Sequence, residues 1–293
     1  MDIIDKTFLN LVQFEKSDVP GLINLSGSIG WDYDENEIGT VMESGKIFGH
    51  KNPEGKIVSS AAIIEYDTKL ASIGMVIVDK GYRGLGLGKD ATQMCIDSVL
   101  YTTSIMLIAT EEGKPLYENM GFVPVDSVHK YLCENYSAAI PLKIPSNYGG
   151  TIIEDFKDIH FNEVLKIDEA AFGDRRNNFL HKRINQSEHC IVVKDHNANV
   201  IGYGAAMLGP VNLILGPIVA PDFQIAALII DSLALRHQGK IRIDVPSGNE
   251  EFMIFLQQRG FNMVSNPPIM VINSANMPQR DNTLFGIAAQ IFG

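Results

Sequence analysis

The chain has 293 residues, of which 45% are apolar and 20% charged, and its 24 Lys and Arg against 35 Asp and Glu give a formal net charge of −11. This composition excludes a disordered or collagen-like chain and allows one large domain or two of about 145 residues each. Because binding a phosphate backbone needs a basic face and no Lys/Arg-rich run exists, we expect no nucleic-acid partner.

Membrane, secretion and metal signals are missing from the sequence. The longest apolar stretch, residues 223–235, is too short to cross a bilayer and contains Asp231, so we expect no membrane partner. The first five residues lack the basic and apolar regions of a secretion signal, which favours a cytoplasmic location. Cys95, Cys133 and Cys190 are widely spaced and the histidines show no ligand spacing, so we expect no metal. The sequence does not predict the oligomeric state.

The first half of the chain mixes strand and helix patterns. Two runs rich in β-branched and apolar residues, 56–66 and 70–78, flank Asp67-Thr68-Lys69 and predict an antiparallel hairpin. After a glycine-rich stretch, the periodicity predicts a helix over 89–100, a strand over 105–109, a helix over 114–120 and a strand over 123–133.

The second half repeats this order. Gly74 and Gly121, with their flanking residues, recur about 140 residues later as Gly216 and Gly260. Between the halves, two prolines and a terminal Asn-Tyr-Gly-Gly are typical of a linker. We therefore divide the chain into a first domain over 1–138, a linker over 139–150 and a second domain over 151–293, each with the same fold.

One segment stands out chemically, the Val-Asp-Lys-Gly-Tyr-Arg-Gly-Leu-Gly-Leu-Gly-Lys of residues 78–89, between a predicted strand and a predicted helix. Its glycines allow backbone N–H groups to converge on a phosphate at the helix N-terminus. Arg83 and Asp90 exclude a Walker A loop. Gly86-x-Gly88-x-x-Ala91 matches the dinucleotide fingerprint formally, but that motif begins directly at the end of its strand. The third possibility is the pattern R-x-x-G-x-G.

That third pattern, with a second motif downstream, resembles the GNAT superfamily of N-acetyltransferases. Residues 78–88 resemble its V-x-P-x-x-R-G-x-G-x-G motif, with Lys80 in place of proline, and Tyr117-x-x-x-Gly121-Phe122 resembles its Y-x-x-x-G-F motif. The resemblance implies an α/β fold of two tandem GNAT units, each a mixed, mostly antiparallel twisted sheet flanked by helices. It also implies transfer of an acetyl group from acetyl-CoA to a primary amine of a small acceptor.

The resemblance assigns roles to particular positions. Tyr117 would protonate the leaving CoA sulfur, and Thr110 stands where the family often has a pantetheine-binding Asn. A strand amide near Val76 would stabilise the oxyanion. The pantetheine arm would add to the strand edge at Val76, Ile77 and Val78, and main-chain N–H groups would hold the pyrophosphate at Arg83, Gly84, Leu85, Gly86, Leu87, Gly88 and Lys89.

The acceptor side is less defined. Trp31, Asp32 and Glu111 are candidate acceptor-binding residues, and Glu65, Asp32, Glu111 and Glu112 are candidates for the base. An acyl-CoA sensor without catalysis is an alternative, and a nicotinamide-dependent dehydrogenase is a third.

The second copy lacks the chemical features of the first. The counterpart of the glycine-rich loop, residues 220–228, has neither glycine nor arginine and is shortened, and Leu256 stands at the tyrosine position. We therefore expect a degenerate copy that does not use acetyl-CoA. It could shape the acceptor pocket through residues 174–176 or Asp244.

Overall fold

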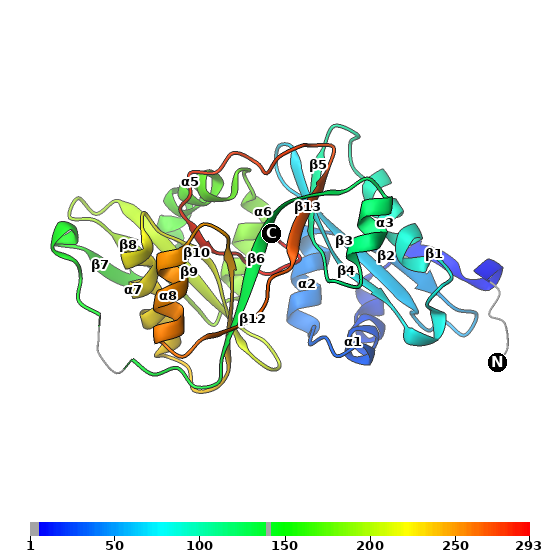
Figure 1. Ribbon diagram of the computed structural model, residues 1–293, viewed down its shortest axis with the longest axis horizontal. Helices are drawn as coiled ribbons and strands as arrows, with labels where there is room; N and C mark the ends of the chain where they lie inside the picture. The colour runs from blue at the N-terminus through cyan, green and yellow to red at the C-terminus, as the bar shows by residue number, and fades with distance from the viewer. Residues whose placement is uncertain (1–5, 139–141) are drawn as a thin grey trace.

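The computed structural model describes residues 6–138 and 142–293. It shows two lobes side by side, with the first half of the chain in one and the second half in the other (Figure 1). Residues 139–141 of the predicted linker lie outside the described residues. The strands and helices of the first half are β1 (Asn10–Gln13), α1 (Val19–Ser28), α2 (Glu35–Ser44), β2 (Gly45–Lys51), β3 (Ser59–Glu65), β4 (Leu70–Val78), α3 (Leu87–Asp97), β5 (Ser104–Ile108), α4 (Lys114–Asn119) and β6 (Val123–Cys133).

The second half repeats this succession through its last helix and then has three strands where the first half has one. Its elements are β7 (Ile152–Asp155), α5 (Phe161–Phe172), α6 (Asn177–Gln186), β8 (His189–Lys194), β9 (Val200–Leu208), β10 (Leu213–Val219), α7 (Phe223–Ala234), β11 (Ile241–Pro246), α8 (Glu250–Gln258), β12 (Asn262–Ser265), β13 (Pro268–Ile272) and β14 (Leu284–Gly286). The strands pair mostly antiparallel, and β4 with β5 and β10 with β11 are parallel pairs. The predicted fold class and the hairpin of β3 and β4 are confirmed.

The two halves exchange strands. The strand order is β1-β2-β3-β4-β5-β13-β6-β11-β10-β9-β8-β7. Strand β13 of the second half inserts between β5 and β6, while the end of β6 lies between β11 and β12 (Figure 1). The division at 139–150 therefore separates two copies in the sequence, but each sheet contains a strand from the other copy.

Strands β4 and β5 diverge in the middle of the first lobe. They pair only from Leu70 opposite Ser104 to Ile73 opposite Leu107. Next to this point β4 carries a bulge against β3, where Met75 has φ of +50° and its carbonyl accepts a hydrogen bond from Ser60 Oγ at 2.7 Å. From Gly74 to Val78, the edge of β4 that faces β5 has no strand partner among the described residues. The bulge and the divergence leave backbone groups open to a ligand.

The C-terminal segment packs between the lobes. The Tyr66 hydroxyl donates to the Phe292 carbonyl at 2.5 Å, and Ser72 Oγ donates to the Ile291 carbonyl at 2.7 Å. Phe292 is fully buried, with its ring 4.6 Å from that of Phe179 on α6. Gly74 permits this packing, because a Cβ there would lie 2.6 Å from Ile291 Cγ1. The segment thus ties β4 to the second half of the chain.

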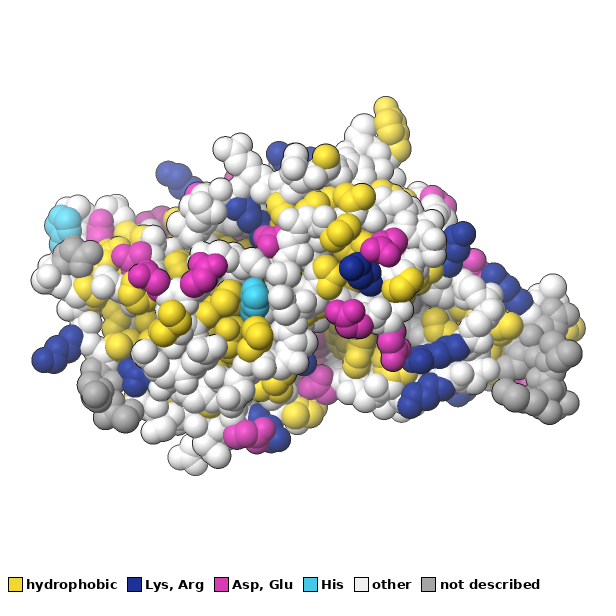
Figure 2. Space-filling view, in the orientation of Figure 1, with side chains coloured by type: hydrophobic (Ala, Val, Ile, Leu, Met, Phe, Trp, Pro, Cys, Tyr) yellow, Lys and Arg dark blue, Asp and Glu magenta, His cyan; other side chains and the backbone are white. Residues whose placement is uncertain are grey.

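Charged side chains of both signs are spread over the surface. On the face in Figure 2, acidic and basic side chains are interspersed over both lobes. No helix within residues 6–138 and 142–293 has the length and apolar character needed to cross a bilayer. In the same described ranges, no group of three or more His, Cys, Asp or Glu is placed to hold a metal ion.

We predict that Gly74→Ala destabilises the protein by about 1–3 kcal/mol, because the added methyl group would overpack against the Ile291 backbone, 2.9 Å away. The measurement is the Tm by differential scanning calorimetry. Gly39→Ala in α2 is the matched control, since its Cβ would meet nothing within 4 Å and alanine favours a helix. Equal Tm values for the two variants would refute the close approach of the C-terminal segment to β4.

Candidate active site

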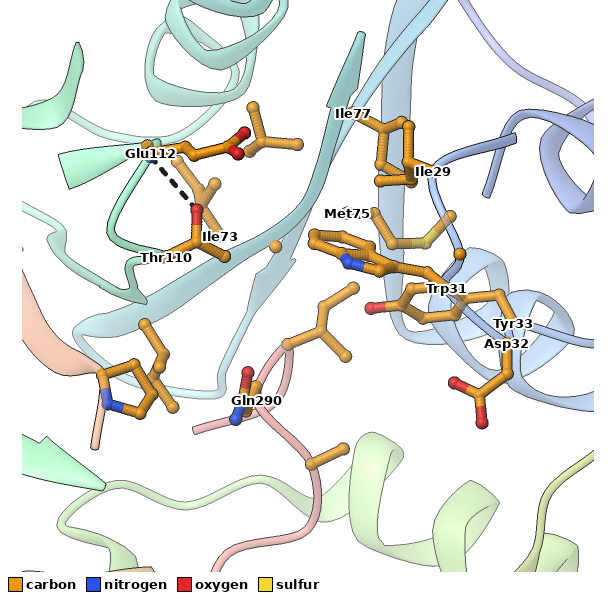
Figure 3. Close-up of a pocket in the computed structure, with 18 of the residues that line it drawn as sticks. Ile29, Trp31, Asp32, Tyr33, Ile73, Met75, Ile77, Thr110, Glu112 and Gln290 are labelled. Carbon is orange, nitrogen blue, oxygen red and sulfur yellow. Dashed lines mark hydrogen bonds between the residues drawn. The ribbon is translucent and has the colours of Figure 1, made fainter. Parts of the chain in front are cut away.

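A cavity of about 1150 Å³ opens beside the free edge of β4 and is lined by residues of both halves. Figure 3 shows Thr110 and Glu112 on one side of it, Trp31, Asp32 and Tyr33 on the other, and Gln290 between them. Among the predicted site residues, Leu85, the candidate base Glu65 and Asp244 do not line it. The predicted residues that do are Trp31, Asp32, Val76, Ile77, Val78, Arg83, Gly84, Gly86, Leu87, Gly88, Lys89, Thr110, Glu111, Glu112 and Tyr117.

The glycine-rich loop leads into an uncapped helix. Gly84 and Gly86 have φ of +84° and +79°, values that favour glycine, and Gly86 is the N-cap of α3 without a side-chain hydrogen bond to the helix. The first-turn N–H groups of α3 therefore remain available at the positive end of the helix dipole. At Gly88 a Cβ would lie 3.3 Å from Val78 Cγ2, so glycine lets the helix approach β4 closely. This geometry fits an anionic phosphate group.

Asp79 fixes the start of the loop. Its carboxylate accepts a hydrogen bond from Gly81 N at 2.9 Å and pairs with Lys56 Nζ at 2.7 Å. The hydrogen bond from Lys56 holds the pKa of Asp79 below its usual range, with a smaller contribution from the Gly81 amide. The Arg83 guanidinium lies 3.6 Å from the exposed Glu112 carboxylate.

Tyr117 lies on α4 with its ring buried and its hydroxyl at the cavity. The ring packs edge-on against Phe122, at 5.9 Å between centroids. Burial raises the pKa of Tyr117 well above its usual value, so the hydroxyl keeps its proton across the physiological range. Among the described residues, the hydroxyl has no hydrogen-bond partner, although an O–H group both donates and accepts. It is available to a ligand in the cavity.

Thr110 shapes the start of α4. Its Oγ1 accepts a hydrogen bond from Gly113 N at 3.1 Å, and its carbonyl accepts one from Lys114 N at 2.9 Å. A Cβ at Gly113 would lie 3.1 Å from both Thr110 Oγ1 and Tyr117 Cε2. Thr110 thus helps to place Tyr117, a role that its position in the motif did not reveal.

The opposite wall comes from the connection between α1 and α2. Trp31 and Tyr33 are half-buried with ring centroids 6.2 Å apart, and Asp32 is exposed. Behind them, Glu37 accepts hydrogen bonds from Arg183 at 2.5 Å and from Gln186 at 2.8 Å. This wall is therefore held by side chains of the second half.

Sequence reasoning missed several polar residues that line the cavity, among them Lys130 at the end of the first half and Arg242 and Gln290 in the second. The alternation Ile-Arg-Ile-Asp-Val of residues 241–245 was a signal that two charged side chains share one face of a strand. It could not indicate that this face meets the first half.

Residues 174–176 do not shape the cavity, contrary to one of our expectations. Asp174 instead accepts hydrogen bonds from Thr68 Oγ1 at 2.5 Å and Leu70 N at 2.8 Å, at the turn between β3 and β4. Arg176 is fully buried and pairs with Asp168 at 2.7 Å. Asp174 thus links the two halves, whereas the Arg176–Asp168 pair lies within the second half.

The corresponding site of the second copy is closed in two ways. Asp222 caps α7 by accepting from the N–H groups of Gln224 and Ile225, both at 3.0 Å, and it also accepts from the Tyr148 hydroxyl. Strand β14 pairs with β10 where β10 diverges from β11, with Ile218 opposite Gly286. The equivalent helix end is thus occupied by a carboxylate and the equivalent strand edge by the chain itself.

Comparisons with known proteins agree with this architecture. Residues 34–143 and residues 164–286 each match a family described as "Acetyltransferase (GNAT) domain". The chain is 36% identical to an uncharacterized N-acetyltransferase, YitH, of Bacillus subtilis (strain 168), and the match covers 100% of both chains.

Two solved structures share the whole arrangement. A putative acetyltransferase from Pyrococcus horikoshii matches with a TM-score of 0.80 and 19% identity over 100% of this chain and 99% of its own. A tandem GNAT protein from the clavulanic acid biosynthesis pathway matches with a TM-score of 0.64 and 12% identity over 90% and 98%. With the two family matches and the full-length relative, they lead to one conclusion: the chain belongs to the GNAT acetyltransferase family and carries two GNAT domains in tandem.

Proposed function

We propose that the first domain transfers an acetyl group from acetyl-CoA to a primary amine of a small acceptor. The observation that carries the proposal is the presence, in one cavity, of an open strand edge, an uncapped helix N-terminus and a protonated tyrosine. The edge of β4 from Val76 to Val78 would pair with the amides of the pantetheine arm. The N–H groups around Gly86 and Gly88 would hold the pyrophosphate.

The reaction follows from this placement. The acceptor amine attacks the thioester carbonyl, so that a C–N bond forms and a C–S bond breaks. A backbone N–H of β4 near Val76 stabilises the oxyanion of the tetrahedral intermediate. Tyr117 gives its proton to the departing sulfur and is reprotonated from solvent. The attacking amine loses its own proton to a cavity carboxylate or to water.

Tyr117 favours an enzyme over an acyl-CoA sensor. A sensor needs the loop and the strand edge to bind acetyl-CoA, but it has no use for a proton donor. A buried tyrosine whose hydroxyl is open to the cavity and lacks a partner among the described residues meets a catalytic need instead.

We further propose that the second domain does not bind acetyl-CoA. Its helix N-terminus is already satisfied by the Asp222 carboxylate, which would also repel a pyrophosphate. Strand β14 fills the position that a pantetheine arm would need. Its Leu256, at the tyrosine position, has no proton to give.

We predict that Gly86→Val weakens acetyl-CoA binding at least about tenfold, because a side chain at this left-handed position obstructs charge-assisted hydrogen bonds to the pyrophosphate. The dissociation constant is measured by isothermal titration calorimetry. Gly55→Val is the matched control, because Gly55 has φ of +81° but lies in the turn between β2 and β3, outside the cavity. Equal weakening by both variants, or by neither, would contradict the assignment of the loop.

We predict that Tyr117→Phe lowers kcat by about 10²-fold or more, the usual contribution of a general acid, while the affinity for acetyl-CoA changes little. Steady-state release of CoA thiol gives the rate, and calorimetry gives the affinity. Tyr101→Phe is the control, because Tyr101 is 89% exposed and lies outside the cavity. An unchanged kcat in Tyr117→Phe would remove the tyrosine from the mechanism. Intact acetyl-CoA with every amine tested would favour the sensor.

A further inference from the structure

Two strands of the second sheet present charged side chains to the cavity. On β11, Ile241, Ile243 and Val245 pack into the core of the second half, so Arg242 and Asp244 point to the opposite face. On β6, Tyr131 packs into the same core, which places its neighbour Lys130 on the opposite face. Lys130 and Arg242 accordingly line the cavity beside the Trp31 connection.

Lys130 makes no ion pair with the acidic residue opposite it on the neighbouring strand. It stands directly opposite Asp244 in the antiparallel pair of β6 and β11, where an opposite charge normally pairs. Both oxygens of the Asp244 carboxylate accept hydrogen bonds from other side chains. Oδ2 accepts from Arg242 Nε at 2.8 Å, and Oδ1 accepts from Gln290 Nε2 at 3.1 Å. No carboxylate of the described residues lies within ion-pair distance of Lys130.

Asp244 holds the Arg242 side chain in place and leaves part of its guanidinium free to donate hydrogen bonds. It contacts Asp244 Oδ2 through Nε and Nη2, both at 2.8 Å, and Nη1 has no partner among the described residues. The carboxylate of Asp244 is only 1% exposed and fixes the guanidinium by this two-pronged contact. The cavity wall thus offers one ammonium group and the two N–H groups of a free guanidinium Nη1.

The charged groups around Lys130 indicate which charges a ligand bound there would carry. Burial lowers the pKa of Lys130, and the Arg242 guanidinium lowers it further, whereas Asp244 and Asp32 raise it. Arg242 and Asp244 neutralise each other, so Lys130 is left without an ion-pair partner among the described residues. Asp32, on the neighbouring Trp31 connection, carries a negative charge that suits a protonated amine. A ligand with both an amine and an anion matches this pattern.

We propose that Lys130 and Arg242 bind a carboxylate of the acceptor, so that the acceptor is an amine that also carries a carboxylate, such as an amino acid. This inference rests on the proposed acetyl transfer and names the substrate class of that same site. A carboxylate is assigned rather than a phosphate because a single uncompensated positive charge matches a single negative charge. Lys130 comes from β6 of the first half, and Arg242 and Asp244 come from β11 of the second, which gives the second domain a part in choosing the substrate.

The test compares amines in matched pairs, with and without the carboxylate. Each pair consists of an amino acid and its carboxamide, assayed with the full chain and acetyl-CoA, and O-phosphoethanolamine against ethanolamine forms the phosphate arm. Wild type is expected to prefer the acid over the amide by about 10- to 100-fold in kcat/KM, through KM, as for a charge-assisted hydrogen bond. A larger preference for the phosphate-bearing amine would overturn the carboxylate assignment.

Variants separate a binding role of Lys130 from a structural one. Lys130→Met should reduce the ratio of acid to amide to near one, and Lys130→Arg should restore most of it because the charge is kept. Lys166→Met, which removes an exposed charge on α5 outside the cavity, should leave the ratio unchanged. A ratio that stays high in Lys130→Met would overturn the proposal.

The outcomes distinguish this inference from the proposed function. Acetylation of amines with no preference for the carboxylate would overturn the inference and leave acetyl transfer standing. If no amine is acetylated, the proposed function fails, and binding of N-acetyl amino acids against their amides is measured by calorimetry. Tighter binding of the acids that is lost in Lys130→Met would support the carboxylate site, and equal binding would overturn it.

Discussion

Strand β6 hydrogen-bonds to both sheets, and the relative position of the two halves depends on it. Its first part pairs with β13 and its second part with β11 and β12, so a single strand crosses from one lobe to the other. It follows α4, the helix of Tyr117, and its second part carries Lys130. Tyr117 and Lys130 therefore lie on consecutive elements, a helix and the strand that follows it.

The gap between the central strands is open to a ligand in the first copy and filled by the chain itself in the second. In both, the parallel pair of central strands diverges and a helix begins at the opening. In the first copy, glycines bring α3 close to β4 and leave its N-terminus uncapped, whereas in the second Asp222 caps α7 and β14 fills the gap. Residues of the second copy, among them Arg242 and Gln290, form part of the wall of the first copy's cavity.

Local sequence patterns predicted the helices, the strands and the glycine-rich loop. The strand exchange and the cavity wall depend on long-range pairing, which these patterns do not reveal. The ranges 70–78 and 123–133 were predicted to the residue, because β-branched and apolar runs bounded by turns describe a strand. The exchange of β6 and β13 was not predictable, since no local signal indicates which sheet a strand joins. Likewise, Lys130 became a candidate only once Arg242 and Gln290 were seen to bind Asp244, and Lys130 lies more than 100 positions before all three in the chain.

The central claim is that one of the two GNAT domains holds acetyl-CoA and the other cannot. Equilibrium dialysis of the full chain against labelled acetyl-CoA measures this directly as the number of molecules bound per chain at saturation. The account predicts one molecule per chain. Two molecules per chain would contradict the closure of the second domain by Asp222 and β14, and none would contradict the cofactor site in the first.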